Sequence, residues 1–590
     1  MTTTRPRSVL RGIAASHGMA VGPVKVIGPA NRWIPRRHVA PDTVDAEIAR
    51  LRDAIERSRA EIEEVRAGMD EGVGADYGLI LDAHMLMHRD ELIVDAAIRA
   101  IRTERRNAEW ALRRTVDDLV EQLGRAGSGY FRERAHDVEH VGQHIMRWLT
   151  EGQPTLPSID TPTILVAEDL SPTDAARLAG MPVLAVVTDL GTATSHTAIL
   201  ARTLEIPAVV GVSNVTSRVG DGDVVIVDAL HGLVVLDADE AEQERARERA
   251  TRYLRFTQEL RDKRVDVVAT ADGVRVELQA NVELPAEAAL AVDSGADGIG
   301  LYRTEFLYLD RVTPPTEEEQ LRVYRDVVAV TSPRVVTFRT YDLGGDKLPQ
   351  SERLPRTLNP ALGLRALRLS LARPDLLRPQ VRAILRASAH GPVRLMFPLV
   401  TTVDDIRRAR AIVDEIREEL AKEGVDASDV PIGIMVEVPS AALLAGALAK
   451  VCDFFSVGTN DLVQYTLALD RTNPQVAHLA RTLDPAVLKL LDLTARAADE
   501  AGIPLAMCGD MAADPFAIPI ALGLGYRTFS MPYAAIPLAR EVIGRIDSTT
   551  AERAAREALD CADAADVEAI VTRVFGDALA DLWREEGLEV

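Results

Sequence analysis

A histidine at the start of a predicted helix is the first residue whose surroundings point to chemistry. In the segment GTATSHTAILAR, His196 follows Thr194 and Ser195, whose residue types cap helices. Apolar residues with helical spacing come after it: Ala198, Ile199, Leu200 and Leu204. The first turn of a helix stabilises a phosphate dianion and keeps an imidazole neutral and nucleophilic. His196 is therefore a candidate phosphate acceptor; the alternative is a capping-turn histidine without chemistry.

Carboxylates follow apolar segments in the second half of the chain. Glu437 comes after IGIMV, and Asn460 and Asp461 come after FFSVGT. Two carboxylates at the ends of consecutive strands, with substrate oxygens and waters, suit one hard cation, Mg²⁺ or Mn²⁺ in its place. We therefore predict a metal site at Glu437 and Asp461.

Arginines and a cysteine accompany these carboxylates. Four arginines have planar guanidinium groups that can donate paired hydrogen bonds to phosphate and carboxylate oxygens: Arg303, Arg339, Arg365 and Arg471. A single arginine is explained by a salt bridge at a rim, but four beside two carboxylates indicate a ligand that carries both kinds of group. Cys508, in LAMCGDM, also ends a strand. A buried structural cysteine is the commoner interpretation, but the position of Cys508 at the same face favours a chemical role.

The elements that must position these residues are eight short apolar strands that alternate with helices after Lys263. They are VELQANVE, GIGLYRTEF, VVTFRTYDL, VRLMFPLV, IGIMVEVP, FFSVGTNDL, PLAMCGDM and RTFSMPY. Eight such units over about 280 residues predict a (β/α)₈ barrel, whose active site lies at the carboxyl ends of its strands. The polar residues collect at those ends: Asn281, Arg303, Arg339, Glu437, Asn460, Asp461 and Cys508. A purely structural barrel has no use for so many buried charges, because unpaired ones are costly.

The first 240 residues predict an α/β unit with a helical insertion. Residues 8–30 alternate apolar runs with glycine and proline, a pattern of two strands with tight turns, and a helical pattern runs from Asp42 to about Thr150. Strand patterns return at TPTILVAEDL, MPVLAVVTDL and DGDVVIVDAL. We predict four parts: an α/β domain of residues 1–41 and 151–236, a helical domain of 42–150, a helical linker of 237–262 and a barrel of 263–590. The linker would span roughly 35 to 40 Å, and we favour a lever over a solvated surface helix.

Composition excludes several classes of protein. The 590 residues suffice for about three or four domains, and no apolar run of about 18 residues predicts a membrane span. Arg11 and His17 interrupt the apolar N-terminal stretch, so we expect a cytoplasmic protein. Three cysteines give no disulfide framework. A formal net charge of -22 argues against binding of nucleic acid.

The motifs together resemble those of the phosphoenolpyruvate-utilising enzymes, and the whole chain is similar to the enzyme I family of the bacterial phosphoenolpyruvate:sugar phosphotransferase system. The resemblance covers GIAASHGMAVG, TSHTAILAR, LYRTEFL, DLGGDK, NPALGLRALR, IGIMVEVPS, FFSVGTNDLVQYTLALDR and MCGDMA. Domain order separates the chain from pyruvate phosphate dikinase and phosphoenolpyruvate synthase. Those enzymes carry an ATP-grasp domain before the histidine, and about 190 residues leave no room for one.

The resemblance implies a function for each of these parts. Phosphoenolpyruvate would bind the barrel with Mg²⁺ on Glu437 and Asp461, and His196 would attack its phosphorus, giving phosphohistidine and pyruvate enolate. Arg303, Arg339 and Arg471 would hold the phosphate and carboxylate with help from Asn460, and Cys508 would protonate the enolate. The phosphoryl group would then pass to the carrier protein HPr, bound by the helical insertion. The family also implies a homodimer formed through the barrel and a linker that acts as a swivel.

Two departures and a possible docking surface complete the comparison with the family. The family usually has GGRTSH or GGMTSH, where this chain has Thr192 and Ala193 before the histidine, and it usually has glutamate where this chain has Asp510. Residues 61–91 contain nine acids and two arginines, which suits a basic patch on HPr; the alternative is a solvated helix face that binds no partner. We expect His84 and Met85 at that surface.

Three other functions remain open at this point. A nitrogen-type regulatory phosphotransferase usually carries an N-terminal sensor domain, and we expect none before Val9. A phosphoenolpyruvate sensor without turnover would not need the set of His196, Glu437, Asp461 and Cys508. A metal-dependent barrel lyase would not need the first 240 residues.

Overall fold

The structure is a computed structural model that describes most of the chain. It covers residues 7–27, 35–67, 81, 84, 85, 87, 88, 92–125, 129–150, 159–191, 195–263, 267–308, 311, 313–344, 348–352, 354, 359–425, 430–471, 473 and 475–585. Contacts divide it into two compact units, Met1–Phe256 and Thr257–Val590. The finer domain boundaries predicted from the sequence remain predictions.

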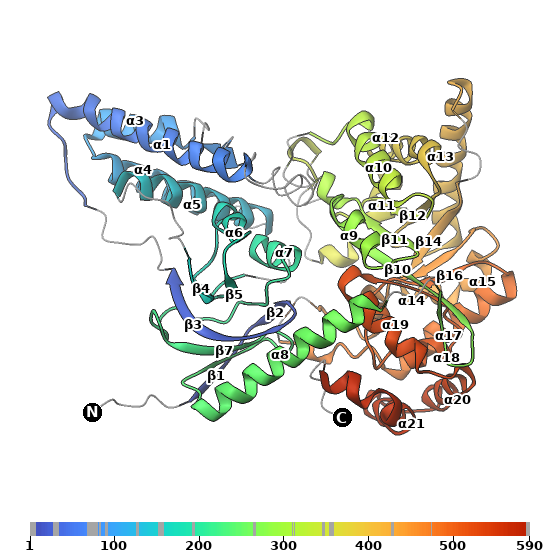
Figure 1. Cartoon of the computed structure of the whole chain (residues 1–590). Helices are drawn as coiled ribbons and strands as arrows, with labels where there is room; N and C mark the ends of the chain where they lie inside the picture. The colour runs from blue at the N-terminus through green and yellow to red at the C-terminus, as the bar shows by residue number, and fades with distance from the viewer. Residues whose placement is uncertain are drawn as a thin grey trace. The chain divides into compact units, whose positions relative to one another are not determined.

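The first unit contains an eight-stranded sheet with the strand order β1-β8-β7-β3-β4-β5-β6-β2 (Figure 1). Its strands are β1 (Ser8–Arg11), β2 (Ile13–Ser16), β3 (Met19–Ile27), β4 (Thr163–Ala167), β5 (Val183–Thr188), β6 (Ala208–Val210), β7 (Val224–Asp228) and β8 (Leu233–Leu236). The neighbours β3, β4, β5 and β6 run parallel, and the other pairs are antiparallel. Helices α6 (Pro172–Arg177) and α7 (His196–Thr203) share one apolar core with this sheet, because Ala176, Ala198 and Leu200 pack against Leu165 and Val186.

A helical segment lies between β3 and β4 in the chain. The helices whose bounds are described there include α1 (Val44–Ala67), α3 (Val94–Glu104), α4 (Ala108–Arg125) and α5 (Gly129–Thr150), which lie together in the blue part of Figure 1. Apolar residues at helical spacing, such as Ile48, Leu51 and Ile55, face a core of their own. The helical insertion predicted from the sequence is therefore present in the fold.

A polar network is buried in this helical segment. The Ser58 hydroxyl lies 2.7 Å from Nε2 of His88 and 3.0 Å from Nδ1 of His144. His144 in turn contacts Glu61 at 2.8 Å, and Glu61 also pairs with Arg177 of α6 at 2.9 Å. Burial, together with the charges of His144, His84 and Arg59, lowers the pKa of His88 to about 3, although the hydrogen bond to the His84 backbone carbonyl opposes the shift. The network therefore holds His88 neutral.

The segment predicted to be a linker is helical, and its linker role remains a prediction. Helix α8 (Glu240–Asp262) is 23 residues long and drawn in green in Figure 1. The boundary between the two units falls within it, at Phe256 and Thr257.

The second unit is a closed barrel of eight parallel strands, which confirms the predicted fold class. Its strands are β10 (Arg275–Val282), β11 (Gly298–Arg303), β12 (Val335–Arg339), β13 (Val393–Phe397), β14 (Ile432–Val436), β15 (Phe455–Val457), β16 (Leu505–Met507) and β17 (Thr528–Pro532). The pairing of β10 with both β11 and β17 closes the barrel, and β9 (Val268–Ala269) is added antiparallel to β10. Each of the eight predicted strings contains one barrel strand.

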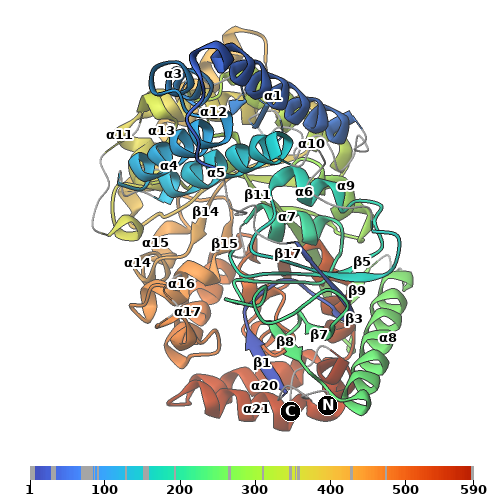
Figure 2. The same cartoon turned by 90° about the vertical axis from the view of Figure 1, so that its left-hand side faces the viewer.

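Helices surround the barrel and cover its outer face (Figure 2). They are α9 (Glu287–Asp293), α10 (Glu317–Thr331), α11 (Ala366–Ala372), α12 (Pro374–Ala387), α13 (Val403–Lys422), α14 (Pro439–Leu443), α15 (Ala445–Leu448), α16 (Thr459–Thr466), α17 (Pro485–Ala501), α18 (Ile518–Gly523), α19 (Ile536–Gly544), α20 (Ser548–Leu559) and α21 (Ala564–Glu585). Inside the barrel, Leu301, Met396, Met435, Phe454 and Cys508 form an apolar cluster. This cluster places Cys508 in the interior of the unit.

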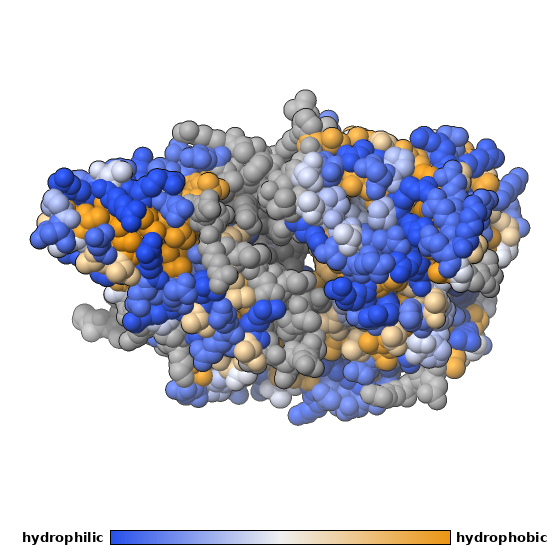
Figure 3. All heavy atoms as spheres, turned by 90° about the horizontal axis from the view of Figure 1, so that it is seen from above, coloured by the Kyte–Doolittle hydropathy of each residue, from blue (hydrophilic) through white to orange (hydrophobic). Residues whose placement is uncertain are grey.

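The surface is mostly hydrophilic on the side seen in Figure 3, with apolar side chains gathered on one part of the helical segment. Among the described residues, every helix is too short or too polar to span a bilayer.

Candidate active site

His196 is the first residue of helix α7, as the sequence predicts. Ser195 has extended backbone angles (φ −66°, ψ 156°) and its hydroxyl accepts a hydrogen bond from the Ala198 N–H at 3.3 Å, so Ser195 is the N-cap. Thr192, Ala193 and Thr194 lie outside the described residues. The backbone of His196 therefore lies where helix N–H groups are free to contact an anion.

The turn before this helix depends on glycine. Gly191 has φ +116°, a conformation that other residues rarely adopt, and a Cβ there would lie 3.2 Å from the Cβ of Val210. Glycine at this position lets the chain pass from β5 toward α7 close to β6.

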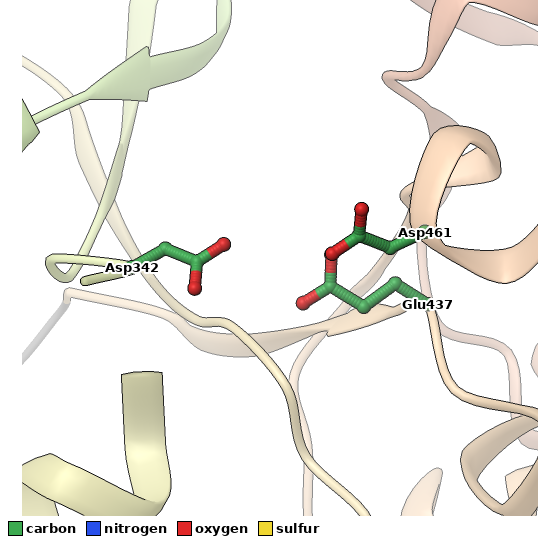
Figure 4. A group of neighbouring side chains, drawn as sticks. All are labelled: Asp342, Glu437 and Asp461. Atoms are coloured by element: carbon green, nitrogen blue, oxygen red, sulfur yellow. The ribbon is translucent and has the colours of Figure 1, made fainter. Parts of the chain in front are cut away.

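Three carboxylates converge at the carboxyl ends of barrel strands: Asp342 after β12, Glu437 after β14 and Asp461 in the first turn of α16. Each offers an oxygen within 4.8 Å of the others, and Figure 4 shows the carboxylate of Asp342 directed toward those of Glu437 and Asp461. Glu437 is 2% exposed and Asp461 is 8% exposed. The Leu399 N–H donates to Glu437 at 2.6 Å, which fixes one of its two oxygens.

The charge of this cluster calls for a cation. Burial and the nearby Asp342 and Asp461 together raise the pKa of Glu437 to about 8, while Arg339 opposes the shift. A hard divalent ion bound here would compensate the mutual repulsion, and carboxylate oxygens are the ligands that such ions prefer. The donor set therefore fits the predicted metal.

Two arginines are paired with this cluster. The Arg339 guanidinium donates to Glu305 at 2.9 Å and lies 3.4 Å from Asp342, and its buried Nε has no hydrogen-bond partner among the described residues. Arg365 donates to Asp342 at 2.7 Å and lies 3.8 Å from Asp461. Burial alone would lower the pKa of Arg339, but Glu305, Asp342 and Glu437 together raise it above its ordinary value. Both arginines are therefore positively charged and held in place.

The other predicted ligand-binding residues lie at the same end of the barrel. Arg471 is 3.4 Å from Asp461 and its side chain is 44% exposed, while Arg303 pairs with Glu283. Asn460 accepts a hydrogen bond from the Asp510 N–H at 2.7 Å. This bond links the start of α16 to the segment after β16. Arg471 and Arg303 are the more accessible of the four arginines.

Cys508 is a buried thiol beside this segment. It is 2% exposed, and its Sγ donates to the Val457 carbonyl at 3.5 Å. Burial raises its pKa to about 11, so the thiol keeps its proton at neutral pH. A Cβ on the neighbouring Gly509 would lie 1.9 Å from the Thr459 hydroxyl, so only glycine allows this close approach of the two segments.

The sequence interpretation missed two residues of the site and misplaced one at the expected docking surface. Asp342 lies three residues after the end of β12, and Glu305 lies two residues after the end of β11. The rule that functional residues lie at the carboxyl ends of barrel strands identified Arg339 and Arg303. Applied also to the residues just after each strand, the same rule would have identified Asp342 and Glu305. His84 was expected at the surface, but it is 3% exposed and pairs with Asp137 at 3.6 Å, which corrects that expectation. Its neighbour Met85 packs partly buried against the core of the α/β sheet.

The fold and the site together define a phosphoenolpyruvate-utilising enzyme. Three family models match the chain in order: "PEP-utilising enzyme, N-terminal" at residues 11–134, "PEP-utilising enzyme, mobile domain" at 159–232 and "PEP-utilising enzyme, PEP-binding domain" at 257–548.

Curated relatives identify the family within this class of enzymes. The phosphoenolpyruvate-protein phosphotransferase of Geobacillus stearothermophilus is 41% identical over 577 residues, which are 96% of this chain and 98% of the relative. Relatives of the same name from Bacillus sp. (strain S) and Staphylococcus aureus are each 40% identical, over 96% and 95% of this chain and 98% and 99% of their own. The chain belongs to the phosphoenolpyruvate-protein phosphotransferase family, which confirms the predicted resemblance to enzyme I.

Proposed function

We propose that this chain transfers the phosphoryl group of phosphoenolpyruvate to His196 and then to a histidine of the carrier protein HPr, releasing pyruvate. Membership of the phosphoenolpyruvate-protein phosphotransferase family supports the first half of this statement. The observation that carries it is the convergence of three carboxylates with Arg339, Arg365 and Arg471 at one end of the barrel.

The charges of the site suit a ligand with a phosphate and a carboxylate. Arg339, Arg471 and Arg303 bind these two groups, and Asn460 contributes a polar contact. Asp342 accepts from Arg365 and lies beside Arg339, so it orients these arginines. Glu437 and Asp461 hold Mg²⁺, or Mn²⁺ in its place. When bound, this ion supplies positive charge to the phosphate and enolate oxygens.

Phosphoryl transfer needs a nucleophile in line with the bond that breaks. A neutral imidazole nitrogen of His196 forms the bond to phosphorus, the bond from phosphorus to the enol oxygen breaks, and its electron pair stays on the enolate. Arg339 neutralises the charge that develops on the substrate oxygens, and its fixed pairing with Glu305 means that little reorganisation is needed.

Completion of the reaction needs a proton on carbon. The raised pKa of Cys508 keeps the thiol protonated at neutral pH, so Cys508 can donate that proton to the methylene carbon of the enolate and give pyruvate. The resulting thiolate regains a proton from solvent.

The two reacting groups belong to different units, since His196 lies in the first and the carboxylates lie in the second. Transfer therefore requires the histidine to reach the barrel and then HPr, and helix α8 is the segment that connects the units. We assign α8 to this swivelling motion and the helical segment α1 to α5 to HPr binding.

A homodimer formed through the barrel is part of the same proposal. Six large apolar side chains in the segments after β12, β14 and β15 are exposed among the described residues: Leu362, Leu364, Leu443, Leu444, Leu479 and Leu493. Exposed leucines of this kind suit contact with a second copy. A cytoplasmic location also belongs to this proposal.

Labelling tests the proposed function. The full chain is incubated with Mg²⁺ and ³²P-labelled phosphoenolpyruvate, and the label is tested for stability in acid and alkali. An acid-labile, alkali-stable label that is absent from His196→Ala is the expected result. Binding of phosphoenolpyruvate without any label would instead make the chain a sensor.

A further inference from the structure

We propose that Gln380 is a positioning residue of the substrate site: from helix α12 it holds the ends of β11 and β12 at the separation that the arginines and carboxylates require. This inference rests on the proposed function, because it concerns the same site. Gln380 contacts none of the proposed ligand groups itself and acts through the two strand ends.

Gln380 is a fully buried amide, and two of its three side-chain hydrogen bonds are to direct neighbours of site residues. Its side chain is 0% exposed. Its Oε1 accepts from the backbone N–H of Tyr341 at 3.0 Å, and its Nε2 donates to the Thr304 hydroxyl at 3.0 Å and to the Tyr324 hydroxyl at 3.3 Å. A buried amide is tolerated only where its groups are bonded, and here each of them has a partner.

These partners connect two strand ends. Thr304 lies between Arg303 and Glu305 at the end of β11, and its hydroxyl donates to the Arg339 carbonyl of β12 at 2.9 Å. Tyr341 lies two residues beyond Arg339 and directly before Asp342. Gln380 therefore forms hydrogen bonds to the segments that follow both β11 and β12. It is not itself one of the proposed ligand-binding residues.

A second link lies nearer to the ligand. One oxygen of Glu305 accepts from Arg339 at 2.9 Å and from the Asp342 N–H at 2.7 Å. Thr304 and Glu305 are adjacent, so the position of this carboxylate depends on the backbone that Gln380 fixes through Thr304. Movement of Thr304 by a fraction of an ångström would move Arg303, Arg339 and Asp342 relative to one another.

The pattern also separates Gln380 from ordinary core packing. An apolar residue of the same length would fill the space on α12, but it would leave the Tyr341 N–H without its acceptor and the Thr304 hydroxyl without its donor. Gln380→Met makes this change with little loss of volume. Gln380→Glu restores both an acceptor and a donor only while the introduced carboxyl group is protonated.

Two control variants separate positioning from stability. Tyr324→Phe removes one partner of Gln380 and leaves its bonds to Thr304 and Tyr341. Thr331→Val removes another buried hydroxyl, on the neighbouring helix α10, whose bond to the Val327 carbonyl stays within that helix.

The test measures phosphoenolpyruvate binding in the absence of turnover. Each variant is made in the full chain with His196→Ala, which removes the phosphoryl acceptor, and phosphoenolpyruvate affinity with Mg²⁺ is measured by calorimetry. Gln380→Met should weaken affinity about tenfold, because a displaced ligand group loses much of its contribution. Tyr324→Phe and Thr331→Val should change affinity less than about twofold. Gln380→Glu should bind more tightly at pH 6 than at pH 8, relative to the parent chain at each pH.

Hydrogen exchange supplies the second readout. The amides of Tyr341 and Asp342 should exchange faster in Gln380→Met than in either control. Equal affinity in Gln380→Met and the controls would overturn the proposal, as would an equal loss in all three. If the His196→Ala chain binds no phosphoenolpyruvate, both proposals fail. If it binds and the otherwise unaltered chain acquires no label, only the proposed function fails.

Discussion

At the scale of single residues, the guanidinium of Arg339 is held from two sides by Glu305 and Asp342. Lysine cannot reproduce this planar pairing, because its ammonium group is a compact charge without the paired N–H donors of a guanidinium. We expect Arg339→Lys to lower kcat/KM for phosphoenolpyruvate about 100-fold. Arg378→Lys is the control, since Arg378 pairs with Glu415 and Glu419 at the surface of the same unit. Similar losses in the two variants, measured by pyruvate release, would remove Arg339 from the site.

Cys508 gives the second prediction for a single residue. Cys508→Ala removes the proposed proton donor while leaving the arginines and carboxylates, so kcat for pyruvate formation should fall about 100-fold with little change in KM. Cys452→Ala, which removes another buried thiol, should leave both constants unchanged. An unaltered kcat in Cys508→Ala would assign the proton to another group.

Among the structural elements, helix α7 depends on its cap. Ser195→Ala removes the hydroxyl that accepts from the Ala198 N–H and should destabilise the start of α7 by about 1 kcal/mol. Ser195→Thr keeps a hydroxyl and should preserve most of that stability. Hydrogen exchange of the α7 amides measures the difference, and equal exchange in the two variants would show that the cap is not needed.

The helical segment α1 to α5 should lose stability in mild acid. Burial holds the pKa of His88 below the ordinary value of 6.5, at about 3, so unfolding takes up a proton between these values. The contribution of neutral His88 to the free energy of unfolding is therefore complete above pH 6.5. It is lost as the pH falls toward 3, at about 1.4 kcal/mol per pH unit.

Hydrogen exchange of α1 and α5 between pH 7 and pH 5 tests this dependence. In His88→Gln, unfolding should take up about one proton fewer, so stability should depend less on pH, because glutamine does not titrate. His231→Gln, at a partly exposed histidine beside Asp228, should not. An unchanged pH dependence in His88→Gln would assign the effect to other groups.

The sequence predicts the elements well and the site in part. Strict alternation of apolar strands and helices is enough to predict the barrel, and the carboxyl-end rule is enough to place Glu437, Asp461 and Cys508 at one face. It does not show that Arg365 reaches Asp342, because that contact depends on the bridge between Gly344 and Arg365. Nor does it show that Gln380 is buried toward the strand ends, since a polar residue on an amphipathic helix ordinarily faces solvent.

For the whole molecule, the division of the chain would separate the two proposed half-reactions. The carboxylates lie in the second unit and His196 in the first, so removal of the metal should block only the step that uses the barrel. We expect EDTA to abolish labelling of His196 by phosphoenolpyruvate and to leave transfer from previously labelled protein to HPr unchanged. Inhibition of both steps would place a metal in the second step as well.

The burial of Cys508 also bears on how the molecule withstands oxidants. Peroxides react with thiolates, and a pKa of about 11 leaves about one thiol in 10,000 ionised at pH 7. The environment that would retain the proton for the proposed transfer to carbon therefore also disfavours oxidation of the sulfur to a sulfenic acid. We therefore expect Cys508 to react with peroxide more slowly than a thiol of ordinary pKa.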